Sequence, residues 1–202
     1  MKGIKIDNYT AKEAMERVVE YMKLESVQTI EMITLDTLKC YEKEREWKEE
    51  VFDITFADSR EVLEKAGIKD ERLLKEAESH LFLKMCTRFM HKNYVKVFLL
   101  AENETVLNDL KLFIQKTCEK VEIVETATWE EHGVSDDMIL NRINGVEAEC
   151  VLAALPSPMQ QEFIAKNRML INARIWIGLG NQLTRKKKIK FNLRQILRYF
   201  SK

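Results

Sequence analysis

The stretch Val95-Lys96-Val97-Phe98-Leu99-Leu100 decides the fold, because its apolar residues form the clearest candidate for a buried central strand. A helical pattern follows over residues 104–118, and Val121-Glu122-Ile123-Val124 is a second strand-like run. A strand, a helix and a strand in this order are typical of the βαβ unit, whose two strands lie parallel in one sheet. This part of the chain therefore predicts an α/β protein.

The same alternation continues in both directions from this stretch. Toward the N-terminus we expect strands at residues 29–35 and 52–56, and helices at residues 10–24, 38–48, 59–67 and 70–91. Toward the C-terminus we expect helices at residues 135–144 and 158–168, and strands at residues 150–154 and 175–178. Thr10-Ala11-Lys12-Glu13 predicts a capping box at the start of the first helix. The sequence thus predicts a Rossmann-like α/β fold with a mostly parallel sheet and helices on both faces.

The length of 202 residues suits one domain or two tightly joined halves, and it allows a sizeable core. Hydrophobic residues make up 46% and charged residues 33%, a balance typical of globular rather than disordered chains. Only 2 prolines and 6 glycines are present, so we expect short connections and no flexible linker. We therefore expect a single α/β domain over residues 1–184, followed by a basic amphipathic appendage over residues 185–202.

The appendage carries an unbalanced charge. The chain has 33 acidic and 33 basic residues, but 8 of the basic residues and none of the acidic ones lie in residues 185–202, which leaves the body at a net charge of −8. Such a segment favours a polyanionic partner, namely a phospholipid surface, a nucleic acid or a phosphorylated substrate. The acidic body and the lack of interleaved aromatic residues in the appendage argue against nucleic acid.

The appendage also has the spacing of an amphipathic helix. Leu193, Ile196, Leu197 and Phe200 fall at i, i+3, i+4 and i+7, so they share one face of a short helix. We therefore expect a short basic C-terminal helix, which either packs on the body of the protein or lies on an anionic membrane surface.

The sequence gives no support for a secretory signal, a membrane span, a disulfide framework or a metal site. The N-terminus has no apolar run of the kind that a secretory signal needs, and no stretch of about 18 apolar residues occurs. The four cysteines are scattered without a Cys-x-x-Cys pair, as is typical of reduced thiols in a cytoplasmic protein. The three histidines lack metal-ligand spacing and no Asp-x-Asp pair occurs, so we expect neither a metal nor a cofactor.

Polar residues follow three of the expected strands. They are Thr34-Leu35-Asp36-Thr37, Ala57-Asp58-Ser59 and Ser157-Pro158-Met159-Gln160-Gln161. Open α/β sheets bind ligands at the carboxyl ends of their strands, where helix N–H groups can also hold phosphate. Asp58 directly follows a strand, so its position fits either a catalytic base or a simple N-cap of the next helix.

The order of these segments resembles the WecG/TagA/CpsF family of bacterial glycosyltransferases. Residues 158–168, Pro-Met-Gln-Gln-Glu-Phe-Ile-Ala-Lys-Asn-Arg, look like the family's Pro-x-Gln-Glu-x-Trp-Ile-x-x-Asn-Arg block, and Ile177-Gly178-Leu179-Gly180 looks like its Gly-Val-Gly-Gly block. Thr34-Leu35-Asp36 is similar to the family's Thr-Leu-Asn, and Ala57-Asp58-Ser59 to its Ala/Pro-Asp-Gly. Residues 3–10 look like the family's first strand and turn, so the resemblance covers nearly the whole chain.

The sequence departs from the family at several turns. Ser59 stands where the family has a glycine after its aspartate, Asp36 replaces the asparagine of the first block, and Asn181 replaces the last glycine. Ala101-Glu102 stands where the family has Gly-Gly, and the family's Arg-Val-Thr-Gly block survives at best as Arg72-Leu73-Leu74-Lys75. Glycines at such turns let a nucleotide approach the backbone, so these changes bear directly on the donor pocket.

The resemblance implies a function and a set of site residues. It implies an inverting, metal-independent glycosyltransferase that moves a sugar such as N-acetylmannosamine from a UDP-sugar to an undecaprenyl-diphosphate-linked acceptor, in cell-surface polysaccharide or teichoic acid synthesis. Asp58 would be the general base. Substrates would be bound by Thr34, Asp36, Ser59, Arg72, Pro158, Gln160, Gly178, Gly180 and Asn181. The membrane or the leaving diphosphate would be contacted by Lys186, Lys187, Lys188, Arg194 and Arg198.

The implied partners are the UDP-sugar donor, the lipid-diphosphate-linked sugar acceptor and an anionic inner membrane surface, with no nucleic acid and with homo-oligomer formation left open. The protein would be cytoplasmic and peripheral on the inner face of the plasma membrane. The changed turns leave a second hypothesis, a catalytically degenerate family member that serves as a non-enzymatic partner or regulator of an active transferase. A third hypothesis, a nucleic-acid-binding module, rests only on the basic appendage.

Overall fold

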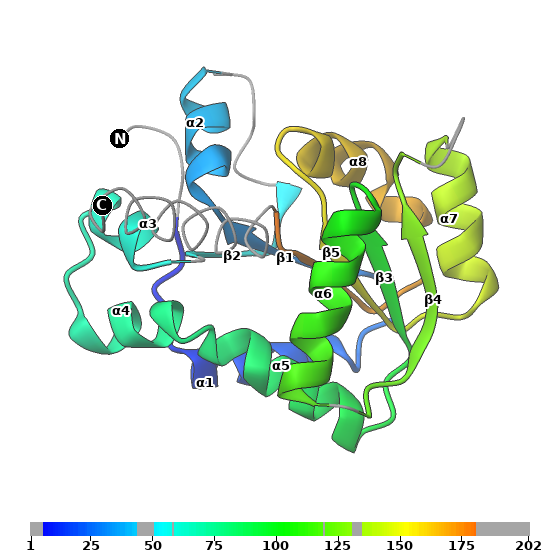
Figure 1. Ribbon diagram of the computed structural model, residues 1–202, viewed down its shortest axis with the longest axis horizontal. Helices are drawn as coiled ribbons and strands as arrows, with labels where there is room; N and C mark the ends of the chain where they lie inside the picture. The colour runs from blue at the N-terminus through cyan, green and yellow to red at the C-terminus, as the bar shows by residue number, and fades with distance from the viewer. Residues whose placement is uncertain (1–5, 44–50, 58, 119, 131–134, 181–202) are drawn as a thin grey trace, which may run out of the picture.

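Six strands form one sheet in the residues that the computed structural model describes, which are 6–43, 51–57, 59–118, 120–130 and 135–180 (Figure 1). The order across the sheet is β2-β1-β6-β5-β3-β4, and every neighbouring pair is parallel. The strands are β1 Gln28–Ile33, β2 Ile54–Ala57, β3 Val97–Ala101, β4 Ile123–Thr128, β5 Cys150–Ala154 and β6 Ile175–Gly178. The predicted Rossmann-like α/β fold is confirmed, and its sheet is wholly parallel.

The central strands are buried on both sides. Every residue of β3 and of β5 is buried, which explains why neither sequence alternates between polar and apolar residues. A parallel sheet needs such uniformly apolar strands, because helices cover both of its faces. β5 and β6 occupy the residues that the sequence predicted for them.

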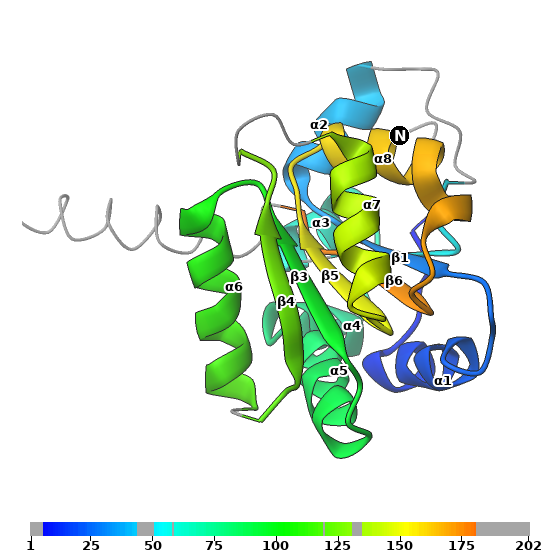
Figure 2. The ribbon, with the colours of Figure 1, turned by 90° about the vertical axis from the view of Figure 1, so that its right-hand side faces the viewer.

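Helices pack on both faces of the sheet. They are α1 Ala11–Tyr21, α2 Leu35–Lys43, α3 Arg60–Lys65, α4 Glu71–Glu78, α5 Leu81–Lys92, α6 Glu104–Thr117, α7 Asp136–Gly145 and α8 Met159–Asn167, with a 3-10 turn at Arg168–Leu170. Buried residues of α1, α5 and α6 share one core with the sheet, whereas those of α7 and α8 share a second core on the other face. Figure 2 shows α6 and α7 on opposite sides of the sheet.

The predicted capping box at the start of α1 is confirmed. The Thr10 hydroxyl accepts a hydrogen bond from the Glu13 N–H at 3.3 Å, and the Glu13 carboxylate accepts one from the Thr10 N–H at 2.8 Å. Two N–H groups that the helix leaves without an internal partner are thereby satisfied. The apolar face of α1, which begins at Ala11, is then buried against the sheet.

The single long helix predicted over residues 70–91 is wrong. The chain forms two helices there, α4 and α5, which are separated at His80, a residue in the left-handed region with φ of 52°. The physical reason is the burial of the two segments. α5 buries five residues, four of which belong to the core of the sheet, whereas α4 buries only Leu74. The break lets α5 pack on the sheet while α4 stays at the surface.

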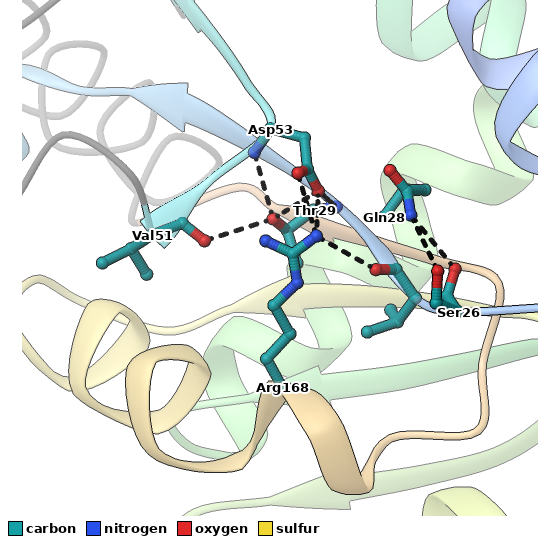
Figure 3. A network of polar contacts seen from close by, with 7 residues as sticks. Ser26, Gln28, Thr29, Val51, Asp53 and Arg168 are labelled. Atoms are coloured by element: carbon teal, nitrogen blue, oxygen red, sulfur yellow. Dashed lines mark hydrogen bonds and ion pairs between the residues drawn. The ribbon is translucent and has the colours of Figure 1, made fainter.

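An ion pair ties the end of α8 to the amino ends of β1 and β2 (Figure 3). Arg168 Nη2 donates to Asp53 Oδ2 at 2.7 Å and to Asp53 Oδ1 at 2.9 Å, and it also reaches the Val27 carbonyl at 3.3 Å. Asp53 Oδ2 in turn accepts from the Thr29 N–H at 2.7 Å. These contacts fix the C-terminal end of α8, so its N-terminal end is held at the opposite edge of the sheet.

Candidate functional site

Three adjacent strands bring the predicted site segments together. β1, β6 and β5 are neighbours in the sheet and run parallel, so their carboxyl ends lie at one edge. Thr34 follows β1, Gly178 is the last residue of β6, and the turn before α8 follows β5. Ligands of open parallel sheets bind at this edge.

Two glycines leave the space that neighbouring side chains fill. A Cβ atom added to Gly178 would lie 2.2 Å from Gln160 Nε2, and one added to Gly180 would lie 2.8 Å from Thr34 Cγ2. Gly180 also has a φ of 56°, which disfavours other residues. The structure therefore brings together four residues of the predicted site in contact: Thr34, Gln160, Gly178 and Gly180.

Three hydroxyl groups form a chain beneath this edge. Ser157 Oγ donates to Thr37 Oγ1 at 3.0 Å, and the hydroxyl oxygens of Thr37 and Thr34 are 3.0 Å apart. The Thr37 N–H also donates to Thr34 Oγ1 at 3.1 Å. Thr34 and Gln160 are each 1% exposed, so they are packed inside the protein at this edge of the sheet. Ser157 and Pro158 are half-buried and are therefore partly accessible to solvent.

A buried carboxyl group adjoins the hydroxyl chain through Gln161, and it is not among the residues predicted from the sequence. Glu31 of β1 has 0% exposure, and it accepts hydrogen bonds from Gln161 Nε2 and, at 3.3 Å, from Tyr41 Oη. Burial raises the pKa of Glu31 to about 8, although the hydrogen bonds from Gln161 and Tyr41 act in the opposite direction. The sequence feature that could have identified Glu31 is that it is an acidic residue within the otherwise uncharged strand β1.

The edge also carries two carboxylates nearer the surface. Asp36 lies in the first turn of α2 with 42% of its side chain exposed, and it pairs with Lys39 at 3.4 Å. Glu102 follows β3 and is half-buried, and its N–H donates to the Ala154 carbonyl at 3.1 Å. β3 and β5 are adjacent while α6 and α8 lie on opposite faces, so Glu102 stands at the topological switch point of the sheet.

The predicted base Asp58 lies outside the described residues. Its neighbour Ala57 ends β2 and is paired in register with Ile33, the residue before Thr34. Ser59 is the N-cap residue of α3 and makes no capping hydrogen bond with its side chain. Both neighbours of position 58 therefore belong to the carboxyl edge of the sheet.

One further predicted site residue, Arg72, lies apart from this group. Arg72 lies on α4, where it pairs with Glu76 at 3.1 Å and leaves 64% of its side chain exposed. Glu76 in turn accepts from the Ala11 N–H at 2.6 Å, which places this pair beside the start of α1. The other predicted residues, together with the predicted C-terminal helix, lie outside the described residues: Asn181, Lys186, Lys187, Lys188, Arg194 and Arg198.

An apolar cavity of about 40 Å³ lies under the end of β2, between α1, α4 and α5, where it is lined by residues that include Met32, Phe56 and Ala57. A cavity of this volume holds only about a few water molecules, far less than a sugar nucleotide. Within the described ranges, no cluster of three or more His, Cys, Asp and Glu residues could hold a metal ion. The same ranges contain no helix that is both long and apolar enough to cross a membrane.

A comparison with known protein families identifies the family of this chain. The model of the glycosyl transferase WecG/TagA/CpsF family matches residues 1–184, which include all six strands and both glycines of the edge. No curated protein matches the chain. Because the match covers far more than half of the sequence, the chain belongs to the WecG/TagA/CpsF family of glycosyltransferases.

Proposed function

We propose that the protein is an inverting, metal-independent glycosyltransferase that moves an N-acetylmannosamine-like sugar from a UDP-sugar to an undecaprenyl-diphosphate-linked acceptor. The product would serve cell-surface polysaccharide or teichoic acid synthesis. The observation that carries this proposal is the meeting of the family's separate segments at one edge of the sheet, where Thr34 packs on Gly180 and Gln160 on Gly178. The absence of an Asp-x-Asp pair from the sequence supports metal independence.

Asp58 is the proposed general base, which removes the proton from the acceptor hydroxyl as that oxygen attacks the anomeric carbon. Attack from the face opposite UDP breaks the bond to the UDP oxygen and inverts the anomeric configuration. Support comes from Ala57 and Ser59, which flank the residue at the carboxyl edge. Helix N-termini at the same edge, α2 and α8 among them, would stabilise charge on the departing diphosphate.

The basic appendage completes the proposal. Residues 1–184 would form the transferase domain, and residues 185–202 would bring cations to the diphosphate and to the anionic inner leaflet. Each basic residue near such a surface contributes about 1 kcal/mol of binding free energy. The protein would then act at the inner face of the plasma membrane, where its lipid-linked acceptor is held.

The test is sugar transfer from a panel of UDP-sugars to a short-chain GlcNAc-diphosphate-lipid, with and without EDTA. We expect transfer by the parent, unchanged by EDTA, and loss of turnover in Asp58→Asn. Asp137→Asn is the matched control, because Asp137 is exposed in the first turn of α7. Full turnover by Asp58→Asn would rule out Asp58 as the base, and loss of transfer with EDTA would rule out metal independence.

One observation favours a second candidate function, a catalytically degenerate partner or regulator of an active transferase. Glu102 places a carboxylate at the switch point of the sheet, where the family has Gly-Gly and where phosphates would be repelled. Thermal unfolding with millimolar UDP distinguishes the two candidates, because a ligand that binds only the folded state must raise Tm. A Tm unchanged by UDP and by every UDP-sugar favours the degenerate partner.

A further inference from the structure

Glu31 occupies a position where a carboxyl group costs stability. It lies on β1, with β2 on one side and β6 on the other, and it has no solvent exposure. No Lys or Arg among the described residues forms an ion pair with it, and burial of an unpaired carboxyl is unfavourable. An apolar residue at this position of β1 would suit the fold better.

Two helices supply the partners of this carboxyl group. Gln161 Nε2 of α8 donates to Glu31 Oε1, and Tyr41 Oη of α2 donates to Glu31 Oε2 at 3.3 Å. α2 and α8 directly follow the two segments that border the candidate site, which come after β1 and β5. Glu31 therefore joins one strand to both helices that begin at the site.

Gln161 extends this link to the hydroxyl chain. Its Nε2 atom carries two hydrogens, of which one goes to Glu31 and the other to Ser157 Oγ at 3.0 Å. Ser157 accepts from Gln161 and donates to Thr37, so these two bonds run outward from the carboxyl group. Ser157 keeps one lone pair, and it is the half-buried member of the chain.

We propose that Glu31 is a positioning residue, which through Gln161 holds the hydroxyl chain of Ser157, Thr37 and Thr34 in the arrangement that the donor sugar nucleotide requires. For the identity of the ligand this rests on the proposed function. Glu31 has no solvent exposure, so it would act on the ligand only through its neighbours. Ser157, whose hydrogen is directed inward to Thr37, is left to accept a hydrogen bond from a donor group of the ligand, such as a sugar hydroxyl.

Glu31→Leu tests the proposal, because it removes the acceptor but keeps an apolar side chain of similar size. We expect kcat/KM for the UDP-sugar to fall roughly 10- to 100-fold, as small displacements of positioning groups do. Tm should not fall, because the cost of the buried carboxyl disappears with it. The NMR signal of the Thr37 amide, whose N–H donates to Thr34 Oγ1, should move.

Three further variants make the result specific. Glu31→Gln keeps an oxygen that accepts from Gln161, so it should keep both the Thr37 signal and kcat/KM. Tyr41→Phe is the matched control, since it removes a hydrogen bond to Glu31 that does not lead to Ser157 and leaves the link through Gln161 intact. Gln161→Met cuts the link from α8, so it should reproduce the effects of Glu31→Leu even where that variant does not fold.

The proposal is overturned if the Thr37 signal stays in place in Glu31→Leu and Gln161→Met. It is equally overturned if both variants unfold, or if the signal moves only together with a lower Tm, because Glu31 is then purely structural. A parent protein that transfers no sugar contradicts the proposed function, while the Thr37 signal still tests the link from Glu31. The two failures are therefore distinguishable.

Discussion

Gln160 occupies the space that a side chain at position 178 would need. A Cβ atom on residue 178 would lie 2.2 Å from Gln160 Nε2, and Gln160 is itself 1% exposed, so it has little freedom to move away. The last residue of β6 and the first turn of α8 are thus fitted to one another. The candidate site depends on this contact between a strand and a helix that are adjacent in the fold.

Gly178→Ala should destabilise the protein by about 1–3 kcal/mol, because the added methyl group overlaps the buried amide of Gln160. Urea unfolding measures this change. Gly145→Ala is the control, since a Cβ atom there meets nothing within 4 Å, and its effect should be neutral or slightly stabilising. Gln160→Ala in the Gly178→Ala background should restore part of the loss, and an unchanged loss would show that the overlap is not its cause.

Stability should decrease as the pH rises from about 4.5 to about 8. The pKa of Glu31 is raised by burial from 4.5 to about 8, so the folded state binds a proton that the unfolded state has released across this range. The contribution of protonated Glu31 to the free energy of unfolding is therefore complete below pH 4.5 and is lost as the pH passes 8. A pKa shift of this kind corresponds to a free energy on the order of a few kcal/mol. Urea unfolding of the parent and of Glu31→Gln should diverge across this range, and parallel pH profiles would contradict a neutral Glu31.

Tyr41 and Cys40 are the other titratable groups near this carboxyl, and neither complicates that experiment. Burial and the neighbouring Glu31 raise the pKa of Tyr41 above its usual value, so its phenol stays neutral over the range studied. Cys40 acts on the pKa of Tyr41, and it is present in both the parent and Glu31→Gln, so its titration is common to the two profiles. The divergence between parent and Glu31→Gln can therefore be assigned to Glu31.

Arg168→Ala should destabilise the protein by about 1–3 kcal/mol, because it leaves the partly buried carboxylate of Asp53 without its cation. Arg168→Lys should recover only part of this loss, since an ammonium group cannot reproduce the contacts of the guanidinium with Asp53 and Val27. Arg60→Ala provides the comparison, as Arg60 pairs with Glu64 at the surface. Equal losses for Arg168→Ala and Arg60→Ala would contradict the role assigned to Arg168.

Tyr94→Gly should stabilise the protein by about 0.5–1 kcal/mol. Tyr94 follows α5 with a φ of 53° and is 78% exposed, so it bears the strain of a left-handed conformation and gains little from packing. Glycine adopts this conformation freely. Asn93→Gly, at a φ of −105°, should have no such benefit, and a higher Tm for Asn93→Gly than for Tyr94→Gly would contradict this reasoning.

The sequence predicted the elements whose pattern is local. β5 and β6 are continuous apolar runs of strand length, and α1 begins at a capping box, so propensity and burial agree at these places. The break between α4 and α5 could not be predicted, because both segments are charged and helical in sequence. The two helices differ in burial, because α5 packs on the sheet with five buried residues whereas α4 buries only Leu74.

The candidate site was predicted where a segment follows a strand or resembles the family's blocks. Thr34 and Gln160 lie in polar segments after expected strands, Gly178 and Gly180 lie in the stretch similar to Gly-Val-Gly-Gly, and the structure places all four at the edge. Glu31 was not predicted, because its proposed positioning role depends on a hydrogen bond from Gln161, which lies 130 residues away in the sequence. Arg72 was included from a weak resemblance, and its contacts lie with Glu76 on α4.

The strand order has a consequence for how the protein is made. Among the described residues β6 is the last strand, yet it lies between β1 and β5, and no other pairing of those residues joins β2-β1 to β5-β3-β4. Until residues 175–178 have been synthesised, these strands can form only two separate pieces of sheet, each with an open edge that can pair with other polypeptides. The insertion of β6 closes both edges, and it also delivers Gly178 and Gly180 to their partners. A nascent chain that stops before residue 175 therefore lacks the site and exposes the edges that aggregate.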